Sequence, residues 1–300
     1  MFIIKYKKIF IIISTVLVVL SLVSLFTFKL NIGIDFKGGA LIEVVYKTEK
    51  PDQEVVRQEL ENLNLGSVVV QPTGDMGYLV KTKDLTEAEH TTLLNTLSFG
   101  GKNELTETNF NSIGPSVGHD LTRKSIIAIV LVSLGIIFFI AFAFRKVSRP
   151  VSSWKYGLIA IGTLLHDVLI PVGIFTVMSH FWGVEIDTLF VVAILTILGL
   201  SVSDTIVIFD RIRENLRHTG GTNKIDFGNI VGTSIEQSYV RSIGTSFTVI
   251  LVLLALVFFG PETTKYFALM LTAGMFFGTY SSIFLASPLL VLVQELQDKK

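Results

Sequence analysis

The sequence contains no cysteine and little charge. Without cysteine, disulfide scaffolds, thiolate metal sites and cysteine nucleophiles are excluded. Charged residues make up 17% of the 300 residues, against about 25% in a typical soluble domain. The formal net charge is zero, so the overall charge does not favour a nucleic-acid partner. Half of the residues are hydrophobic, and the charges gather in a few segments, which is typical of a membrane protein.

Six apolar stretches are long enough to cross a bilayer as helices, which takes about 20 residues each. They span residues 9–28, 125–144, 156–178, 186–209, 242–260 and 266–293. The first follows three lysines, as a signal peptide would, but its apolar run exceeds the usual ~7–15 residues and no clear cleavage site follows it. We therefore interpret it as an uncleaved anchor and predict an α-helical integral membrane protein with six transmembrane helices.

The basic residues of the short loops predict the orientation, because such loops stay in the cytoplasm. The loops 179–185 and 261–265 carry only Lys265 between them. The other two short loops and their edges are basic, with Arg145, Lys146, Arg149, Lys155, Arg211, Arg213, Arg217, Lys224 and Arg241. We expect both termini in the cytoplasm, residues 1–28 as tail and first helix, 29–124 as an extracytoplasmic domain, and 125–300 as helices two to six.

The segment 41–113 alternates short strand and helix patterns. Residues 41–46, 67–71, 78–81 and 104–113 alternate as strands do, with a turn expected at 72–75. Residues 52–63 and 86–97 have helical spacing, and Thr86 with Glu89 fits a capping box. The order predicts a ferredoxin-like βαββαβ domain, an α+β fold, with both helices on one face of the sheet. His90 is interpreted as a solvated surface histidine, because its helix is polar.

The strongest candidates for chemistry are ionisable residues within the apolar stretches, where they are costly and usually functional. Asp204 lies deep in the fourth stretch, and Arg241 lies at the start of the fifth. If the two helices are antiparallel neighbours, Asp204 and Arg241 lie at a similar depth, so the geometry allows an ion pair between them. The alternative is that both are charges near the headgroups; Arg241 could reach them with its long side chain, whereas Asp204 could not.

A polar stripe surrounds Arg241 on its helix. Gln237, Ser238, Gly244, Thr245 and Thr248 lie three, four or seven residues from it, which places them on one helical face. A face that contacts lipid has no use for such residues, so the stripe indicates a packed or wet interior.

His166 and Asp167 lie in the middle of the third stretch. Pro171 follows four residues after Asp167, so the Asp167 carbonyl lacks its usual helical donor. A locally opened helix beside a buried acid can host water or a cation. The alternative is a structural kink with a neutral, hydrogen-bonded carboxyl, and we favour function because an acid and an imidazole coincide.

Several other patterns have simpler explanations. Gly274 and Gly278 favour close helix packing. The segment 210–215, which includes Asp210 and Arg211, reads as a solvated continuation of the fourth helix. His119 and Asp120 are interpreted as part of a turn and helix cap.

Six segments together resemble the SecF family of protein-export membrane subunits. Gly33, Asp35, Gly38 and Gly39 fall in the segment that resembles the family's signature after its first helix, and Gly114 and Pro115 fall in the one before its second. His166-Asp167, 203–215 (with Asp210 and Arg211), 241–246 and 280–288 match later motifs, of which 203–215 is the most specific. The family usually has threonine or a bulkier residue where this chain has 242–244, which leaves Arg241 in place.

The resemblance implies membership of the resistance-nodulation-division superfamily and a place in a prokaryotic cytoplasmic membrane. It implies SecD as the partner half, beside the SecYEG channel, and an unfolded polypeptide as cargo. Protons, or sodium in some relatives, would drive the export. By position, Asp204 and Arg241 match the family's ion-coupling pair, and Asp167 and His166 match polar residues of the same region.

Two classes of function compete on these observations. One is an ion-coupled transport subunit without enzymatic catalysis, metal or cofactor. The other is a passive anchor that displays a binding domain, with the buried charges as structural contacts. The anchor would not need Asp204, His166 and Asp167 at depth, which favours the first. A membrane hydrolase is a distant third, because no nucleophile-elbow or zinc motif is present.

Overall fold

A computed structural model describes residues 2–143, 151–218 and 226–298. Arg145, Lys146, Arg149 and Lys224 of the expected cytoplasmic loops lie outside these residues. The chain divides into two compact units, Met1–Asn31 with Ile127–Lys300, and Ile32–Ile126. We call the first the membrane unit and the second the α+β unit, and describe each by itself.

Six helices of the described residues are long and apolar enough to cross a membrane, as predicted. The first five are α2 (Lys7–Phe28), α6 (Pro115–Ala143), α7 (Ser153–Trp182), α8 (Thr188–His218) and α9 (Phe227–Phe259). The sixth is α10 (Glu262–Ser281), which continues through a π-helical turn, η1 (Ser282–Ala286), into α11 (Ser287–Asp298). The short elements α1 (Phe2–Lys5), β1 (Asn31–Ile32) and β6 (Glu185–Ile186) flank these helices. Polar helical turns extend α8 and α9 beyond the apolar stretches.

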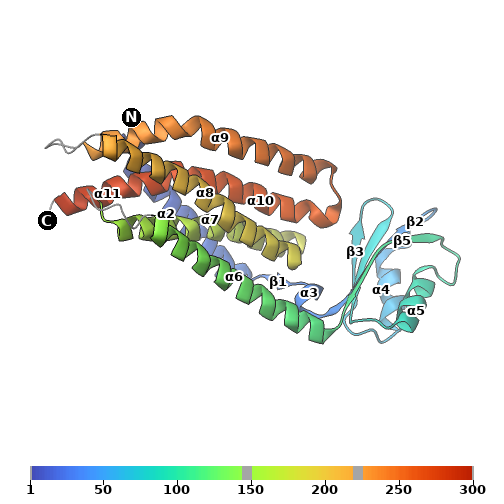
Figure 1. Ribbon diagram of the computed structural model, residues 1–300. Coiled ribbons are helices and arrows are strands. Elements are labelled where there is room, and N and C mark those ends of the chain that lie inside the picture. Colours follow the sequence, from blue (N-terminus) through green and yellow to red (C-terminus); the bar gives the residue numbers. More distant parts are fainter. Residues whose placement is uncertain (1, 144–150, 219–225, 299–300) are drawn as a thin grey trace. The chain divides into compact units, whose positions relative to one another are not determined.

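Helices α7, α8 and α10 form the interior of the membrane unit (Figure 1). At least half of the apolar window is buried in α7, α8 and the α10–α11 span, but less than a fifth in α2, α6 and α9. Glycine allows the close contact of α8 with α10: a Cβ at Gly274 would overlap the side chain of Ile197, and one at Gly278 would lie 3.3 Å from the Ser201 Cβ. The pattern Gly274-x-x-x-Gly278 therefore serves packing, as expected.

The α+β unit has the predicted βαββαβ order. Its strands are β2 (Gly39–Tyr46), β3 (Val69–Thr73), β4 (Gly77–Thr82) and β5 (Leu105–Ile113), and its helices are α4 (Gln53–Glu61) and α5 (Glu87–Leu97). The antiparallel sheet has the order β3-β4-β2-β5, with Ile42 opposite both Val80 and Phe110. Both helices contribute to one core, in which Val56, Leu60, Leu93 and Leu97 pack with Ile42, Val44 and Val80. Figure 1 shows α4 and α5 next to each other beside the sheet.

Local signals fix the ends of the two helices in this unit. Asp52 caps α4 by accepting from the Glu54 amide at 2.9 Å, and Thr86 with Glu89 forms the predicted capping box of α5. The turn between β3 and β4 begins later than expected, because Pro72 and Thr73 belong to β3. β3 is an edge strand, where a proline costs no ladder hydrogen bond if its nitrogen faces outward.

His90 is not the solvated histidine that the sequence suggested. Its ring stacks on Phe110 with centroids 3.9 Å apart, and its Nε2 lies 3.1 Å from Glu107 Oε1. Both partners come from β5, which is remote in sequence, so the polar surroundings of His90 within α5 gave no sign of the contact.

Candidate functional site

Asp204 lies near the middle of α8, about 24 Å along the axis from its start. Hydroxyl groups of two other helices approach its carboxylate. Thr279 of α10 donates to Oδ2 at 3.3 Å, and Ser246 of α9 does so at 3.5 Å. The Ser242 hydroxyl lies beside the same carboxyl group. The side chain is partly exposed, so Asp204 sits at a junction of three helices that remains open on one side.

Arg241 does not form the ion pair with Asp204 that the sequence left open. Among the described residues no ion pair joins them, although the charge of Arg241 still acts on the Asp204 carboxylate. The reason is the rotation of α9 about its own axis, which decides which of its residues face α8. Ser242 and Ser246 face α8 and α10, whereas Arg241, one residue earlier, is exposed on the adjoining face.

The polar stripe of α9 therefore divides into two. Ser238 belongs to a buried row in which serines recur every four residues, Ser234, Ser238, Ser242 and Ser246. Gln237, Gly244, Thr245 and Thr248 lie with Arg241 on the exposed side, where Gln237 accepts from Asn215 of α8 at 3.0 Å. The buried row contacts the neighbouring helices of this chain, while the exposed row is uncovered in the single chain.

Asp167 and His166 form a second centre on α7, and both are fully or almost fully buried. The Nδ1 atom of His166 lies 2.8 Å from Asp167 Oδ1. Ser281 of α10 donates to Asp167 Oδ2 at 2.7 Å, and Ser201 of α8 donates to the same oxygen. Hydroxyl groups of two other helices thus hold the Asp167 carboxylate, as is also the case for Asp204. Unlike Asp204, Asp167 has no exposed side.

The two centres lie on either side of the contact between α8 and α10. Asp204 binds Thr279 of α10, and Asp167 binds Ser281, two residues later. Thr205 of α8 lies 2.8 Å from Ser282 at the start of the π-helical turn, which adds a further hydroxyl contact. A shift of α10 against α8 would consequently change the hydrogen bonds of both carboxylates.

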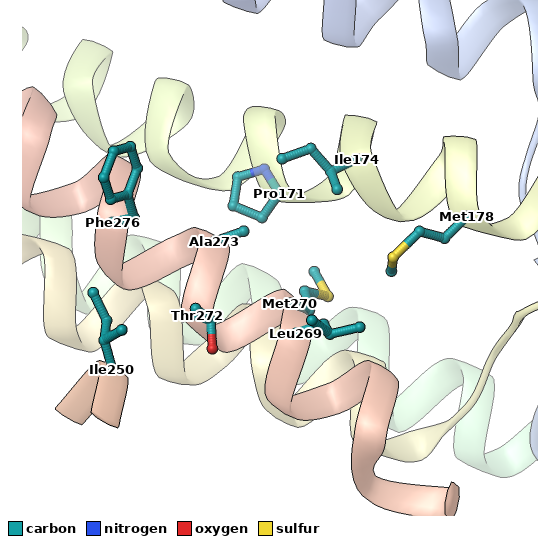
Figure 2. Close-up of a pocket in the computed structure, with 9 residues that line it drawn as sticks. All are labelled: Pro171, Ile174, Met178, Ile250, Leu269, Met270, Thr272, Ala273 and Phe276. Atoms are coloured by element: carbon teal, nitrogen blue, oxygen red, sulfur yellow. The ribbon is translucent and has the colours of Figure 1, made fainter. Parts of the chain in front are cut away.

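An apolar hollow of about 340 Å³ lies between α7, α9 and α10. Figure 2 shows Pro171, Ile174 and Met178 of α7 across from α10. The remaining lining residues are Ile250, Leu269, Met270, Thr272, Ala273 and Phe276. The Thr272 hydroxyl already donates to the Ala268 carbonyl at 2.8 Å. The hollow beside Pro171 therefore offers no set of oxygen ligands for a cation, and α7 continues unbroken through the proline.

The glycines singled out near the first helix have a structural explanation within the α+β unit. Gly38 and Gly39 have φ angles of 80° and 140°, which disfavour other residues. A Cβ on Gly38 would lie 2.9 Å from the backbone of Pro115, next to Gly114, and one on Gly118 would meet the Gly38 nitrogen. The segment that includes Gly33 and Asp35 thus packs directly against the first turns of α6, with backbone in contact with backbone.

The remaining predicted residues lie in exposed helical turns. Asp210 pairs with Arg213, and Arg211 with Glu214 at 2.7 Å, all on the last turns of α8. His119 and Asp120 lie inside α6, which begins at Pro115, so they are not the turn and helix cap that the sequence suggested; Asp120 pairs with Lys124 at 2.7 Å within the helix. These pairs are local and solvated, so they contribute little to stability.

Sequence reasoning missed the hydroxyl groups that hold the two acids. Ser201, Ser246, Thr279 and Ser281 lie in largely apolar helices, where small hydroxyl residues resemble ordinary packing residues. The four-residue repeat of serine in α9 was visible in the sequence and could have identified its buried face. The partners of Asp167 depend on contacts between distant helices and had no local signal.

Comparisons with known proteins agree across nearly the whole chain. Residues 94–296 match the family "Protein export membrane protein SecD/SecF, C-terminal", and residues 23–50 match the "SecD/SecF GG Motif". The protein translocase subunit SecF of Thermobaculum terrenum is 44% identical over 96% of this chain and 92% of its own length. The protein translocase subunit SecDF of Bacillus subtilis is 31% identical over 94% of this chain.

A solved structure is also similar. The crystal structure of SecDF from Thermus thermophilus superposes with a TM-score of 0.80 and 30% identity over 97% of this chain. The chain spans 38% of the length of that SecDF and 36% of the Bacillus subtilis protein, so both are much longer polypeptides.

Proposed function

The chain belongs to the SecD/SecF family of protein export membrane proteins, and on that premise we propose that it uses a cation gradient to help move polypeptides across the membrane. It is a multi-pass SecF subunit of the Sec translocation machinery. The proposal concerns the energy source, the residues that couple it to movement, and the partners.

The observation that supports coupling most strongly is the setting of Asp204. The carboxylate is in a membrane-spanning helix, is partly exposed, and is held by hydroxyl groups of α9 and α10. No cationic side chain among residues 2–143, 151–218 and 226–298 pairs with it directly. A carboxylate in these surroundings can take up and release a proton as its hydroxyl contacts change. Arg241 stays charged throughout and can modulate the acid, but it cannot carry the proton.

Movement would follow from the contacts that Asp204 shares. Binding of a proton removes the charge that Thr279 and Ser246 solvate, which lets α8, α9 and α10 repack. Asp167 and His166 lie across the α8–α10 contact and would respond to the same shift. Sodium is the alternative coupling ion, because carboxylate and hydroxyl oxygen atoms such as those around Asp204 are the type of ligand atom that such cations bind.

SecD is the proposed partner, beside a SecYEG channel and an unfolded polypeptide. One relative is a single longer SecDF chain. In this chain α6, α2 and α9 are the three least buried spans, and α9 displays Arg241, Thr245 and Thr248 on its uncovered face. Polar groups at membrane depth need protein or water around them, and SecD would supply that cover.

We place the protein in the prokaryotic cytoplasmic membrane, with both termini in the cytoplasm and residues 29–124 outside. The half-buried Arg211 and Arg213 near the end of α8 support this orientation through the positive-inside rule. A passive anchor remains the competing function. It is less favoured because structural contacts alone would be better served by a direct ion pair than by an exposed arginine and a partly open acid.

Proteoliposomes that contain SecYEG, the translocation ATPase and this chain, with or without SecD, test the proposal. A proton or a sodium gradient is imposed in turn, and export of a preprotein is followed by protease protection. We expect one of the two gradients to accelerate export, and only when SecD is present. Equal rates with and without both gradients, in vesicles that hold the two subunits as a complex, would contradict cation coupling.

A further inference from the structure

Several buried polar atoms in the membrane unit are without a hydrogen-bond partner within the part of the chain that the structure describes. Two of them, Nε2 of His166 on α7 and Oγ of Ser14 on α2, come from helices that pack against each other. The residues are 3% and 1% exposed, so lipid or bulk water cannot supply the missing partner. Buried polar groups in proteins are almost always hydrogen-bonded, so each of these two atoms requires a partner such as a bound water molecule.

The packing of α2 against α7 places these atoms at the same level. The two helices run in parallel: Ser21 lies against Gly173, Ser24 donates to the Gly173 carbonyl at 3.1 Å, and further along Asn31 binds Ser179. Seven residues before Ser21 is Ser14, and seven residues before Gly173 is His166. Because seven residues make about two helical turns, both lie on the contacting faces at one depth.

Tyr280 of α10 supports the same placement from a third helix. Its hydroxyl donates to the carbonyl of Phe10, one turn before Ser14, at 3.5 Å. Its ring is roughly parallel to the His166 ring, with centroids 6.5 Å apart. One aromatic side chain therefore contacts α2 beside Ser14 and approaches the imidazole of His166.

The hydrogen bond to Asp167 determines what Nε2 can do. When Asp167 is ionised its oxygen atoms only accept, so Nδ1 of His166 then carries the hydrogen that lies between it and Asp167 Oδ1 at 2.8 Å. In the neutral imidazole Nε2 then has a lone pair and no hydrogen. It can accept a proton, and the adjacent carboxylate would stabilise the imidazolium that forms.

We propose that Ser14 and His166 hold one water molecule between α2 and α7, and that His166 Nε2 takes up a proton there. The water would donate to Nε2 in the neutral state and accept from it after protonation, while Ser14 supplies the other partner. The inference deepens the proposed function, because it adds a second proton site and connects it to α2, the helix that leads along the chain into the α+β unit.

The titratable groups on the helices packed around this site are few. Near the level of His166 they are Asp167 on α7, Tyr280 on α10 and Asp204 on α8, and the other titratable groups of α7, α8 and α10 lie toward the helix ends. Helix α2 has none between Ile9 and Phe28. Asp204 is engaged with Thr279 and Ser246, so Asp167 is the group that directly contacts the imidazole. A titration of His166 therefore reports mainly on the Asp167 pair and on Ser14.

Nitrogen-15 NMR of the full chain, histidine-labelled and in lipid nanodiscs, tests the site without any need for export. His166→Asn identifies the His166 signals among the five histidines and keeps an amide donor near Asp167. As the pH falls from about 8 to 5, we expect the chemical shift of Nε2 to change from that of an unprotonated to that of a protonated nitrogen. Ser14→Ala should move the midpoint, and Thr15→Ala, an exposed neighbour on α2, should not.

Two results would overturn the proposal: a His166 Nε2 that keeps one protonation state over this range, or equal midpoints in the unmodified protein and Ser14→Ala. Export in proteoliposomes is scored separately. If the His166 titration depends on Ser14 but neither gradient accelerates export, the proposed site stands and the proposed function is wrong.

Discussion

The two buried acids of the membrane unit have similar partners and opposite access. Asp167 is 0% exposed, and His166, Ser201 and Ser281 all contact it. Asp204 is partly exposed, and its two hydroxyl partners lie at 3.3 and 3.5 Å. Both Asp204 partners also bond to carbonyls of their own helices. The difference suits a structural role for Asp167 between α7, α8 and α10, and it is why we propose Asp204 rather than Asp167 as the group that exchanges a proton.

The largest effect that we predict is on stability. Asp167→Ala leaves Ser201 and His166 Nδ1 buried without their acceptor, and we expect a loss of about 3 kcal/mol or more in the free energy of unfolding. Asp204→Ala should cost less than half as much, since Ser246 and Thr279 retain backbone acceptors. Thermal unfolding in detergent, followed by the fluorescence of Trp154 and Trp182 at the ends of α7, measures both. Equal losses would remove the distinction between the acids.

The contact between α8 and α10 should affect both acids together. Gly274→Val would place methyl groups where the Ile197 side chain lies, and we expect overpacking to cost about 1–3 kcal/mol. Gly199→Ala on α8 is the matched control, because its Cβ would meet nothing within 4 Å. The same fluorescence assay applies. A Gly274→Val protein as stable as the control would show that the close approach of the two helices is unnecessary.

Arg241 should matter for export more than for stability. Its side chain is exposed in the single chain, so Arg241→Lys is expected to change the free energy of unfolding by less than about 0.5 kcal/mol. Lysine keeps the charge but loses the planar group with five donors, so we expect gradient-driven export to fall severalfold. Thr245→Val, a neighbour on the exposed row, serves as a comparison. Unchanged export in Arg241→Lys would leave charge alone as the requirement.

The smallest effect concerns an acid outside the membrane, Glu89. The bond from Lys83 and the capping contacts with Thr86 lower the pKa of Glu89 to about 2 from its usual 4.5. Its ionised form therefore stabilises the start of α5 above about pH 4.5, and this contribution is lost as the pH falls through about 2. Hydrogen exchange of the first turn of α5 should be faster in Glu89→Gln near neutral pH and converge with the unmodified protein near pH 2. A difference that persists at pH 2 would contradict this assignment.

The sequence predicted the elements because their signals are local. Long apolar runs identify the six spans whatever their neighbours are, and alternation with caps at Asp52 and Thr86 identifies the βαββαβ order. Asp204 and Asp167 stood out because an acid within an apolar run is costly. The turn after β3 was misplaced, because a proline on an edge strand carries the same signal as a proline in a turn.

The contacts of the site could not be predicted, since they depend on how helices are rotated against one another. A difference of one residue in the phase of α9 places Ser242 and Ser246, rather than Arg241, at Asp204. Ser201 and Ser281 reach Asp167 from helices 34 and 114 residues away in the chain. The pairing of His90 with Glu107 and Phe110 is a long-range contact of the same kind in the α+β unit.

The most direct test of the account is gradient-driven export by Asp204→Asn, with Asp120→Asn as the control. Asparagine keeps the shape of the side chain and one carbonyl acceptor for Thr279 and Ser246, but it cannot take up a proton. Asp120 is exposed at the start of α6, where the same change should be neutral. We predict that Asp204→Asn inserts, retains SecD and exports at the rate seen without a gradient, while Asp120→Asn responds normally. Export by Asp204→Asn at the normal rate and with normal gradient dependence would contradict the account, and Asp167 would become the next candidate for the coupling group.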